Sequence, residues 1–409
     1  MITKYHDFMN VKSQEPFRID GVVRPPHFTD RATEIARIRD TLRSPPAKLL
    51  VYGPRRMGKT STILLAAEAA ERDGASVVRA DLSTASSTAD VTNRLLAAAV
   101  RGVGRTWKDL ATTFVERLRI SVGLRPDPLT GLAIPTLDAG LRSADAEAQR
   151  RTLADSLDTL NALAGERGVR LGIILDEFQE IHRLGGETAE WHLRGVLERH
   201  EHVSYVLSGS RTSLIERMVS DQGRAFYKLL DLLLLGPIEE EHFSRWIDER
   251  MSAAGRPEPG LGRRCLEVAG PRTRDVVQLA RACWRAWSAD LELDPLVGVG
   301  FLDIVAEEEG MARTLWSGFT AVQQDVLRAV AGGVAGLTTR ETLDRFALPA
   351  SGTVSNTVAA LVAGDVLVKV DGPPGYDFES PFFRGWVITR ALADVGLERP
   401  PTWRSTLGR

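Results

Sequence analysis

The stretch Gly53-Pro-Arg-Arg-Met-Gly58-Lys59-Thr60 decides the fold class, because it matches the pattern G-x-x-x-x-G-K-[ST]. It ends a short apolar run, residues 47–53, that is bounded by turn residues and indicates a buried strand. It opens residues 57–74, whose pattern is typical of a helix closed by a glycine. A glycine-rich loop between a strand and a helix turns successive backbone N–H groups toward a phosphate. The stretch therefore predicts a phosphate-binding loop, the P-loop, in an α/β protein.

The side chains of this loop indicate how it would hold a nucleotide. Lys59 is a mobile cation that can reach the β- and γ-phosphates, and the Thr60 hydroxyl is a hard oxygen ligand for Mg²⁺. The expected cofactors are therefore ATP or ADP with Mg²⁺. The alternative is a glycine-rich turn that only caps a core helix, and the flanking strand and helix disfavour it. The residues expected to contact the nucleotide are Gly53, Pro54, Arg55, Arg56, Met57, Gly58, Lys59, Thr60 and Ser61.

A second apolar strand, over residues 169–177, ends in the two acids Asp176 and Glu177. Carboxylates at the end of a buried strand are costly unless they face a cation. We expect Asp176 to hold Mg²⁺ through water, and Glu177 to orient and deprotonate the water that attacks the γ-phosphate. The alternative is a surface acidic turn, which the P-loop pattern upstream disfavours. ATP hydrolysis is the expected activity, with Lys59 assisting at the phosphates.

Two serines end the next predicted strand, residues 202–210. Ser208 and Ser210 are candidates for the polar residue that senses the γ-phosphate, and the order of the strands favours Ser208. Serine at a strand end otherwise serves turn chemistry.

The whole chain has 409 residues, of which 43% are hydrophobic and 26% charged, as in ordinary soluble proteins with two or three domains. A net charge of −2 gives no general attraction to nucleic acid or to anionic membranes. Cys265 and Cys283 form no CxxC pair, so we expect no zinc site, and sparse cysteine fits a reducing cytoplasm. The polar first residues and the short apolar runs predict neither a signal peptide nor a membrane span.

The order of patterns along the chain predicts its organisation. Before the first strand, Asp30 or Thr29 can cap a helix whose apolar positions Ile35, Ile38 and Leu42 share one face. Five predicted strands alternate with helices in the first half, which indicates a parallel sheet. These strands are expected at residues 47–53, 76–83, 169–177, 202–210 and 229–238. Helices alone follow, and then three helices precede short strands, the order typical of a winged helix. The expected segments are a loose N-terminal arm (1–20), a P-loop core (21–236) with an inserted β-hairpin at about 117–138, a helical lid (237–290), a connector with a short helix (291–315) and a winged-helix domain (316–409).

The stretches YGPRRMGKTS, LDEFQ, YVLSGS and SPFFRGW resemble the archaeal-type ATPase family, which belongs to the STAND ATPases near the AAA+ class. The resemblance covers about residues 22–390. It implies an AAA+-like sheet with a central P-loop strand, a helical lid and a C-terminal winged helix. It also implies that Phe28 lies near the adenine, and that Arg274 in the lid senses phosphate, with Arg272 as the alternative. A solvated helix start with paired charges would explain Arg274 equally well.

One departure from the family concerns its Pro-Leu-Tyr-Gly-Arg stretch before the fifth strand. Here the chain reads Gly223-Arg-Ala-Phe-Tyr-Lys228, so the arginine that would reach a neighbour's nucleotide is missing if Tyr227 is in register. Arg224 or Lys228 could substitute, and the sequence leaves this open.

Charge patterns bear on the partner. Residues 316–409 hold nine basic and nine acidic residues, and residues 351–366, the expected reading helix of the winged helix, lack Lys and Arg. DNA affinity rests on neutralising phosphates, so this segment is expected to bind duplex DNA poorly. Any DNA contact is expected at the hairpin, through Arg119 and Arg125 with Arg117 nearby.

These observations favour a nucleotide-controlled molecular switch with slow ATPase activity. ATP held between core and lid would fix the angle of the winged helix and so expose or hide a surface for the partner. A protein partner or a second copy of the chain is the expected partner. Two alternatives stay open: a DNA-acting AAA+ motor or loader, and a scaffold that holds nucleotide without hydrolysing it. Turnover stimulated by polynucleotide would favour the motor, whereas copurified nucleotide without turnover would favour the scaffold.

Overall fold

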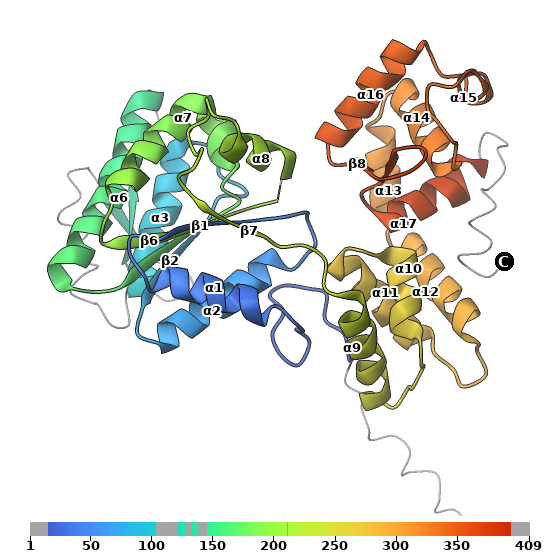
Figure 1. Ribbon diagram of the computed structural model, residues 1–409, viewed down its shortest axis with the longest axis horizontal. Helices are drawn as coiled ribbons and strands as arrows, with labels where there is room; N and C mark the ends of the chain where they lie inside the picture. The colour runs from blue at the N-terminus through green and yellow to red at the C-terminus, as the bar shows by residue number, and fades with distance from the viewer. Residues whose placement is uncertain (1–14, 104–121, 127–132, 138–144, 211, 394–409) are drawn as a thin grey trace, which may run out of the picture. The chain divides into compact units, whose positions relative to one another are not determined.

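The computed structural model of the protein describes residues 15–103, 122–126, 133–137, 145–210 and 212–393. The chain divides into two compact units (Figure 1). The sheet unit is Asp30–Gly236, and the helical unit joins Met1–Thr29 to Pro237–Arg409. No helix within the described part of the chain is long and apolar enough to cross a membrane.

A five-stranded sheet forms the middle of the sheet unit, and all its strands are parallel in the order β2-β5-β6-β1-β7. Both β5 and β6 are buried at every position, as expected for a parallel sheet covered on both faces. The α/β fold expected from the sequence is thus confirmed. The P-loop strand β1 is interior, but the middle position belongs to β6, which corrects the expectation of a central P-loop strand. The strands are β1 (Lys48–Tyr52), β2 (Ser76–Asp81), β5 (Leu171–Asp176), β6 (Val203–Gly209) and β7 (Asp231–Leu234).

Helices cover both faces of this sheet (Figure 1). Successive strand side chains point to opposite faces, so Val51 packs under α1 and α2 whereas Leu50 joins the core beneath the helices opposite. The first face carries α1 (Ala32–Leu42) and α2 (Lys59–Arg72). The second carries α3 (Thr88–Val103), α6 (Ala146–Arg167), α7 (Glu180–Arg199) and α8 (Thr212–Ser220).

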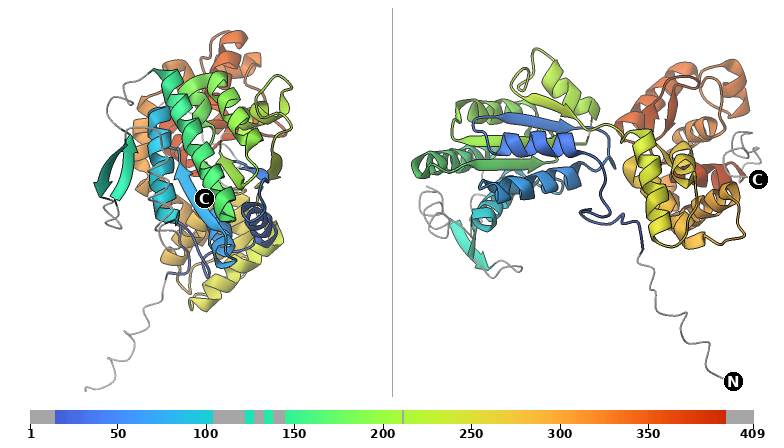
Figure 2. Two further views of the ribbon diagram at one scale, coloured as in Figure 1. Left: turned by 90° about the vertical axis from the view of Figure 1, so that its left-hand side faces the viewer. Right: turned by 60° about the horizontal axis from the view of Figure 1, so that its bottom comes forward.

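A separate antiparallel hairpin, β3 (Val122–Pro126) with β4 (Ala133–Leu137), lies beside α3 and away from the main sheet (Figure 2). These strands fall within the region where the sequence predicted a hairpin. Its turn and the candidate DNA contacts Arg117 and Arg119 lie outside the described residues. The backbone of Arg125 lies in β3.

The start of α1 differs from the sequence prediction. Neither Thr29 nor Asp30 caps the helix, because Asp30 and Arg31 both adopt the left-handed conformation, with φ of 62° and 70°. The Arg31 side chain is buried and donates from its two Nη atoms to the Gly236 carbonyl, at 2.5 Å, and to Glu34, at 3.1 Å. Arg31 therefore ties the first residues of the sheet unit to its last.

The helical unit has one continuous hydrophobic core. Side chains of the expected lid, connector and C-terminal segment belong to the same cluster. Phe301 of the expected connector and Phe382 of the C-terminal segment, for example, have ring centroids 5.3 Å apart. Its main helices are α9 (Glu240–Ala253), α10 (Leu261–Ala269), α11 (Thr273–Ala286), α12 (Leu293–Glu307), α13 (Glu309–Ser317), α14 (Ala321–Ala331), α15 (Arg340–Arg345), α16 (Ser351–Ala363) and α17 (Pro381–Trp386). A π-helical turn, Val387–Ala391, follows α17.

The segment expected to be a connector is mostly helix. It contains α12, whose residues Leu296, Val297 and Ile304 are almost completely buried in the shared core, and most of α13. The C-terminal segment places α14, α15 and α16 before an antiparallel ribbon of β8 (Leu367–Lys369) and β9 (Tyr376–Phe378).

The interpretation of residues 1–20 as a loose arm is wrong for residues 15–20. Phe17 is 1% exposed in the core of the helical unit, and its ring lies 6.0 Å from that of Trp246 in α9. Glu15 pairs with Arg281 and Arg285 of α11, and two nitrogens of Arg250 donate to the Pro16 carbonyl.

Candidate nucleotide-binding site

The P-loop connects β1 to α2 at the carboxyl edge of the sheet, where its glycines have conformations that other residues would strain. Gly53 has φ of 152°, and a Cβ atom there would lie 2.4 Å from the Leu235 carbonyl oxygen. Gly58 has φ of 87° and precedes the first residue of α2. Of the other residues predicted in the loop, Met57 and Ser61 are buried, Pro54 and Arg56 are half-buried, and Arg55 and Thr60 are exposed.

Lys59 is the first residue of α2 and is 7% exposed. Its Nζ donates to the carbonyls of Gly53, at 2.8 Å, and Pro54, at 2.6 Å. Burial lowers the pKa of Lys59 to about 8, although the charges of Glu177 and Asp176 act in the opposite direction. Lys59, Asp176 and Glu177 lie at the same carboxyl edge, because the P-loop follows β1 and the acids follow β5 in one parallel sheet.

Asp176 is the last residue of β5 and is 4% exposed. One carboxylate oxygen, Oδ2, accepts from Nη2 of Arg79 on β2 at 2.7 Å. The other, Oδ1, accepts from the Ser208 hydroxyl and from the backbone N–H of Glu177. Both oxygens of this buried carboxylate are therefore engaged, which offsets the cost of its burial.

Glu177 follows with a left-handed backbone, φ 56°, which is uncommon for a residue other than glycine. Its Oε2 accepts from the Ser210 hydroxyl, at 2.8 Å, and from the Gln179 side-chain amide. Gln179 is 2% exposed, and a Cβ atom on Gly209 would lie 2.6 Å from its Oε1. Gly209 therefore leaves the space in which Gln179 reaches Glu177.

Ser208 near the end of β6 and Ser210 just after it contact different acids. Ser208 donates to Asp176, whereas Ser210 donates to Glu177. Ser208 is 1% exposed and Ser210 is 8% exposed. The hydroxyl of Ser208, the expected phosphate sensor, thus already donates its hydrogen bond to Asp176.

The residues around Asp176 suit Mg²⁺ only together with a nucleotide. Among the described residues, no group of three or more His, Cys, Asp or Glu side chains could hold a metal ion. Asp176 and the Thr60 hydroxyl supply hard oxygen atoms, and Mg²⁺ commonly completes such a small set with phosphate oxygens and water. The donor set therefore fits magnesium bound with phosphates.

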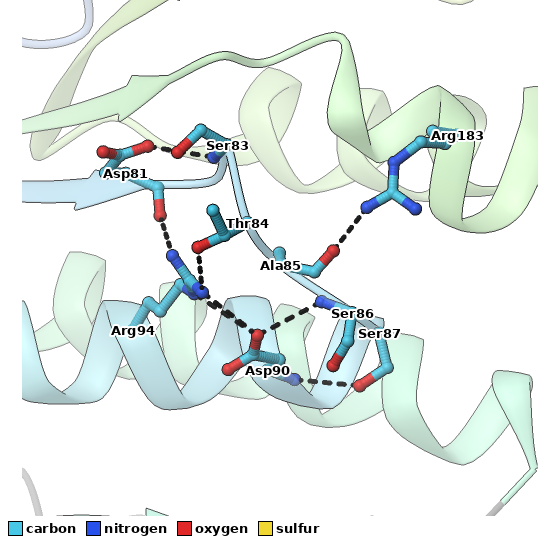
Figure 3. A network of polar contacts seen from close by, with 9 residues as sticks. All are labelled: Asp81, Ser83, Thr84, Ala85, Ser86, Ser87, Asp90, Arg94 and Arg183. Atoms are coloured by element: carbon cyan, nitrogen blue, oxygen red, sulfur yellow. Dashed lines mark hydrogen bonds and ion pairs between the residues drawn. The ribbon is translucent and has the colours of Figure 1, made fainter. Parts of the chain in front are cut away.

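The loop after β2 borders the same edge of the sheet and is held by two arginines (Figure 3). Arg94 donates to the Asp81 carbonyl at 2.9 Å and to the Thr84 hydroxyl at 2.8 Å, and Arg183 donates to the Ala85 carbonyl. Asp90 accepts from the backbone N–H of Ser86. These contacts order the loop between β2 and α3.

Two predicted site residues, Phe28 and Arg274, lie in the helical unit and not in the sheet unit. Phe28 is half-buried, and Arg274 is exposed in the first turn of α11. The alternative residue Arg272 pairs with Glu379 at 3.2 Å within the helical unit.

Arg224 and Lys228, the two candidates to reach a neighbouring nucleotide, differ in their surroundings. Arg224 pairs with Glu187, at 2.9 Å, and with the fully buried Glu190, at 2.5 Å. Lys228 is exposed, and its Nζ lies 5.2 Å from the centroid of the Tyr227 ring. Arg224 is thus engaged by acids of its own unit, whereas Lys228 lies at the surface.

Sequence reasoning missed Arg79 and Gln179 as neighbours of the two acids. Arg79 sits in a predicted strand, where a single arginine usually marks a solvated face. Arg79 reaches the site because β2 pairs with β5. In this pairing Arg79 lies opposite Ile174, and Asp81 lies opposite Asp176. Gln179 stood in the quoted LDEFQ stretch without an assigned role.

A P-loop after the first strand of a parallel sheet, with two acids at the end of β5 on the far side of β6, is the arrangement of the class of P-loop ATPases. Residues 28–244, more than half of the chain, match the model of an ATPase domain found predominantly in Archaea. The chain belongs to this family, as its motifs indicated.

Solved structures share the fold. A Walker-type ATPase of Pyrococcus abyssi has 16% sequence identity and a TM-score of 0.61, over 91% of this chain and 99% of that chain. The ORC2 protein of Aeropyrum pernix, solved with ADPNP and ADP, has 17% identity and a TM-score of 0.55, over 92% and 98%. The ORC1 protein of the same organism, solved with DNA, has 14% identity and a TM-score of 0.50, over 92% and 97%. No curated protein sequence matches the chain.

Proposed function

We propose that the protein binds ATP with Mg²⁺ and hydrolyses it slowly, and that the bound nucleotide switches what the helical unit binds. The observation that carries the proposal is the gathering of Lys59, Asp176 and Glu177 at one edge of the sheet. Membership of an ATPase family supports it.

Each residue has a role that follows from its contacts. The backbone of the P-loop and Lys59 bind the phosphates. Asp176 and Thr60 would hold Mg²⁺, which when bound withdraws charge from the phosphates and orients them. Ser208 and Arg79 orient Asp176, so we now assign Ser208 to positioning and not to sensing phosphate.

Glu177 is the proposed general base. Two donors, Gln179 and Ser210, hold Oε2, which leaves Oε1 to accept the proton of the attacking water. The same two contacts orient the carboxylate. In the helical unit, Arg274 is the proposed phosphate sensor, because Arg272 already pairs with Glu379. Phe28 remains the proposed adenine contact.

The partner of the switch is proposed to be a protein or a second copy of the chain. We propose that α14 to α16 and the β8–β9 ribbon form a winged helix, because they follow one another in that order. Its expected reading helix, α16, exposes the small uncharged residues Ser355, Asn356, Ala359 and Ala360, which offer no charge to DNA phosphates. If another chain supplies a cation to the nucleotide, Lys228 is the better candidate, since internal acids occupy Arg224.

The test separates binding from hydrolysis. Lys59→Ala should lower the affinity for a fluorescent ATP analogue at least about a hundredfold, because the phosphates lose their mobile cation. Glu177→Gln should keep the affinity but lower the hydrolysis rate by about 10²–10⁴-fold, since an amide accepts no proton from water. Equal hydrolysis rates in the wild type and Glu177→Gln would overturn the assignment of the base.

The two alternatives predict other results. Turnover stimulated by DNA would favour a motor or loader, and the DNA in the ORC1 structure makes DNA a candidate to include. Nucleotide that copurifies with the wild type without any turnover would favour a scaffold.

A further inference from the structure

Asp176 already has a cationic partner in the protein. Arg79 reaches from β2 and donates to Oδ2 of Asp176 at 2.7 Å, and its side chain is 29% exposed while that of Asp176 is 6% exposed. The pair joins two neighbouring strands, because β2 runs parallel to β5 and Asp81 lies opposite Asp176. The buried carboxylate of Asp176, a proposed metal ligand, is thus paired with the partly exposed guanidinium of Arg79.

The contacts of Arg79 would let its guanidinium leave Asp176. Asp176 is its ion-pair partner among the described residues, and its Nε is buried without a hydrogen bond there. Asp176, by contrast, is also held by the Ser208 hydroxyl and by the Glu177 N–H, both on Oδ1. Loss of the Arg79 contact would therefore free the guanidinium, and the two groups on Oδ1 would still orient Asp176.

Two cations beside one buried carboxylate repel each other. A divalent ion that draws on Asp176, directly or through its water, gains less where an arginine already neutralises that carboxylate. The guanidinium must then leave Oδ2 or share it, and its partial exposure gives it a path to solvent.

We propose that Arg79 is a built-in competitor of the divalent ion at Asp176, and that it sets the metal concentration at which the protein holds metal–nucleotide. The inference rests on the proposed nucleotide site and adds the residue that tunes its metal affinity. The P-loop and Lys59 would bind the nucleotide without contact from Arg79. Nucleotide binding in the absence of metal is therefore largely independent of Arg79.

The test measures metal affinity and not activity. Full-length protein is saturated with ADP, Mn²⁺ is titrated in, and free Mn²⁺ is followed by electron paramagnetic resonance. Arg79→Gln should lower the Mn²⁺ dissociation constant by about tenfold, the scale expected when one cation leaves a carboxylate. Arg79→Lys keeps the charge on a shorter stem and should lower it by less than Arg79→Gln.

Arg183→Gln is the matched control, because Arg183 also pairs with an acid, Glu180, near the same edge but does not contact Asp176. It should leave the Mn²⁺ affinity unchanged. An unchanged or weaker affinity in Arg79→Gln would overturn the inference. If that variant fails to fold, a weaker affinity in Arg79→Lys would do the same.

A first measurement with fluorescent ADP in EDTA separates this inference from the proposed function. If the wild type binds no nucleotide, the proposed function fails. If every variant binds nucleotide but the metal affinity does not move, only the role of Arg79 fails.

Discussion

The sheet unit and the helical unit differ in what they bury. The sheet unit buries ionisable groups at the carboxyl edge of its sheet, among them Lys59, Asp176 and Glu180. The buried polar and charged residues described in the helical unit are Arg272, Asp275 and Thr342, and the rest of its buried interior is largely one apolar cluster. Because burying charge costs free energy unless partners compensate, the sheet unit depends on the hydrogen bonds and the ion pair that hold these groups. The helical unit instead has an interior in which one apolar cluster joins its helices.

The same comparison changes how the proposed switch would work. The sequence suggested a lid and a winged helix joined by a connector, with ATP between core and lid fixing the angle of the winged helix. The shared core, with Phe301 of α12 against Phe382 of α17, indicates that the two segments respond together. A signal from the nucleotide would therefore act on the whole helical unit.

The largest expected effect concerns this shared core. Phe382→Ala should destabilise the helical unit by about 3–5 kcal/mol, because it removes a buried ring and leaves a cavity. Hydrogen exchange followed by mass spectrometry should show α10, α12 and α16 losing protection together. Gly352→Ala on the open side of α16 is the control, since a Cβ atom there meets nothing within 4 Å. Loss of protection confined to α17 would show that the two segments are separate bodies.

The next effect concerns the chemistry of the sheet unit. Gln179→Ala should lower kcat by about tenfold or more while KM stays within about twofold, because one donor that positions Glu177 is lost. Steady-state kinetics checks both constants. Ser204→Ala is the control, because this buried serine of β6 donates to the Leu42 carbonyl, away from the acids. An equal fall in kcat in both variants would indicate a general effect on the fold.

A smaller effect is expected where the N-terminal segment joins the helical unit. The hydrogen bond from Arg281 lowers the pKa of Glu15, so this carboxylate contributes stability above its ordinary pKa of 4.5, and the contribution is lost as the pH falls through the lowered value. Glu15→Gln should cost about 0.5–1 kcal/mol at pH 7, as for a half-exposed ion pair. Urea unfolding from pH 7 to pH 3 should show this difference vanishing in acid. The exposed Glu249→Gln should show no such trend.

The smallest effect is expected for DNA. In the full chain, reversing Arg340 and Arg345 of α15 to glutamate should change duplex DNA affinity by less than about twofold at physiological salt. Reversing Arg119 and Arg125 should weaken whatever binding exists, and that binding should fall steeply with salt. Electrophoretic shifts at rising salt measure both. A large loss from the α15 pair would give the helical unit a role in binding DNA.

Local patterns carried much of the fold. The five parallel strands followed from apolar runs with turn residues at their ends, and the α/β class followed from their alternation with helices. The P-loop and the acids at the end of β5 also lie where local sequence indicated. The roles of Lys59, Thr60, Asp176 and Glu177 stay predictions.

What local sequence could not supply is long-range pairing. The position of Arg79 beside Asp176 depends on β2 lying next to β5, and no pattern within either strand states their order. The burial of Phe17 depends on helices more than two hundred residues later, such as α9 with Trp246. The capping of α1 failed for a local reason, since Asp30 adopts a left-handed backbone that helix-start rules do not anticipate.

The contact between Arg31 and Gly236 has a consequence for biosynthesis. It shows that the chain enters and leaves the sheet unit at one point, so this unit is an insertion within the helical one. Synthesis runs from the N-terminus, and the last strand, β7, is complete before α9 leaves the ribosome. The sheet unit can therefore fold first, whereas Phe17, among the earliest described residues to emerge, must wait for α9 and α11 before it is buried.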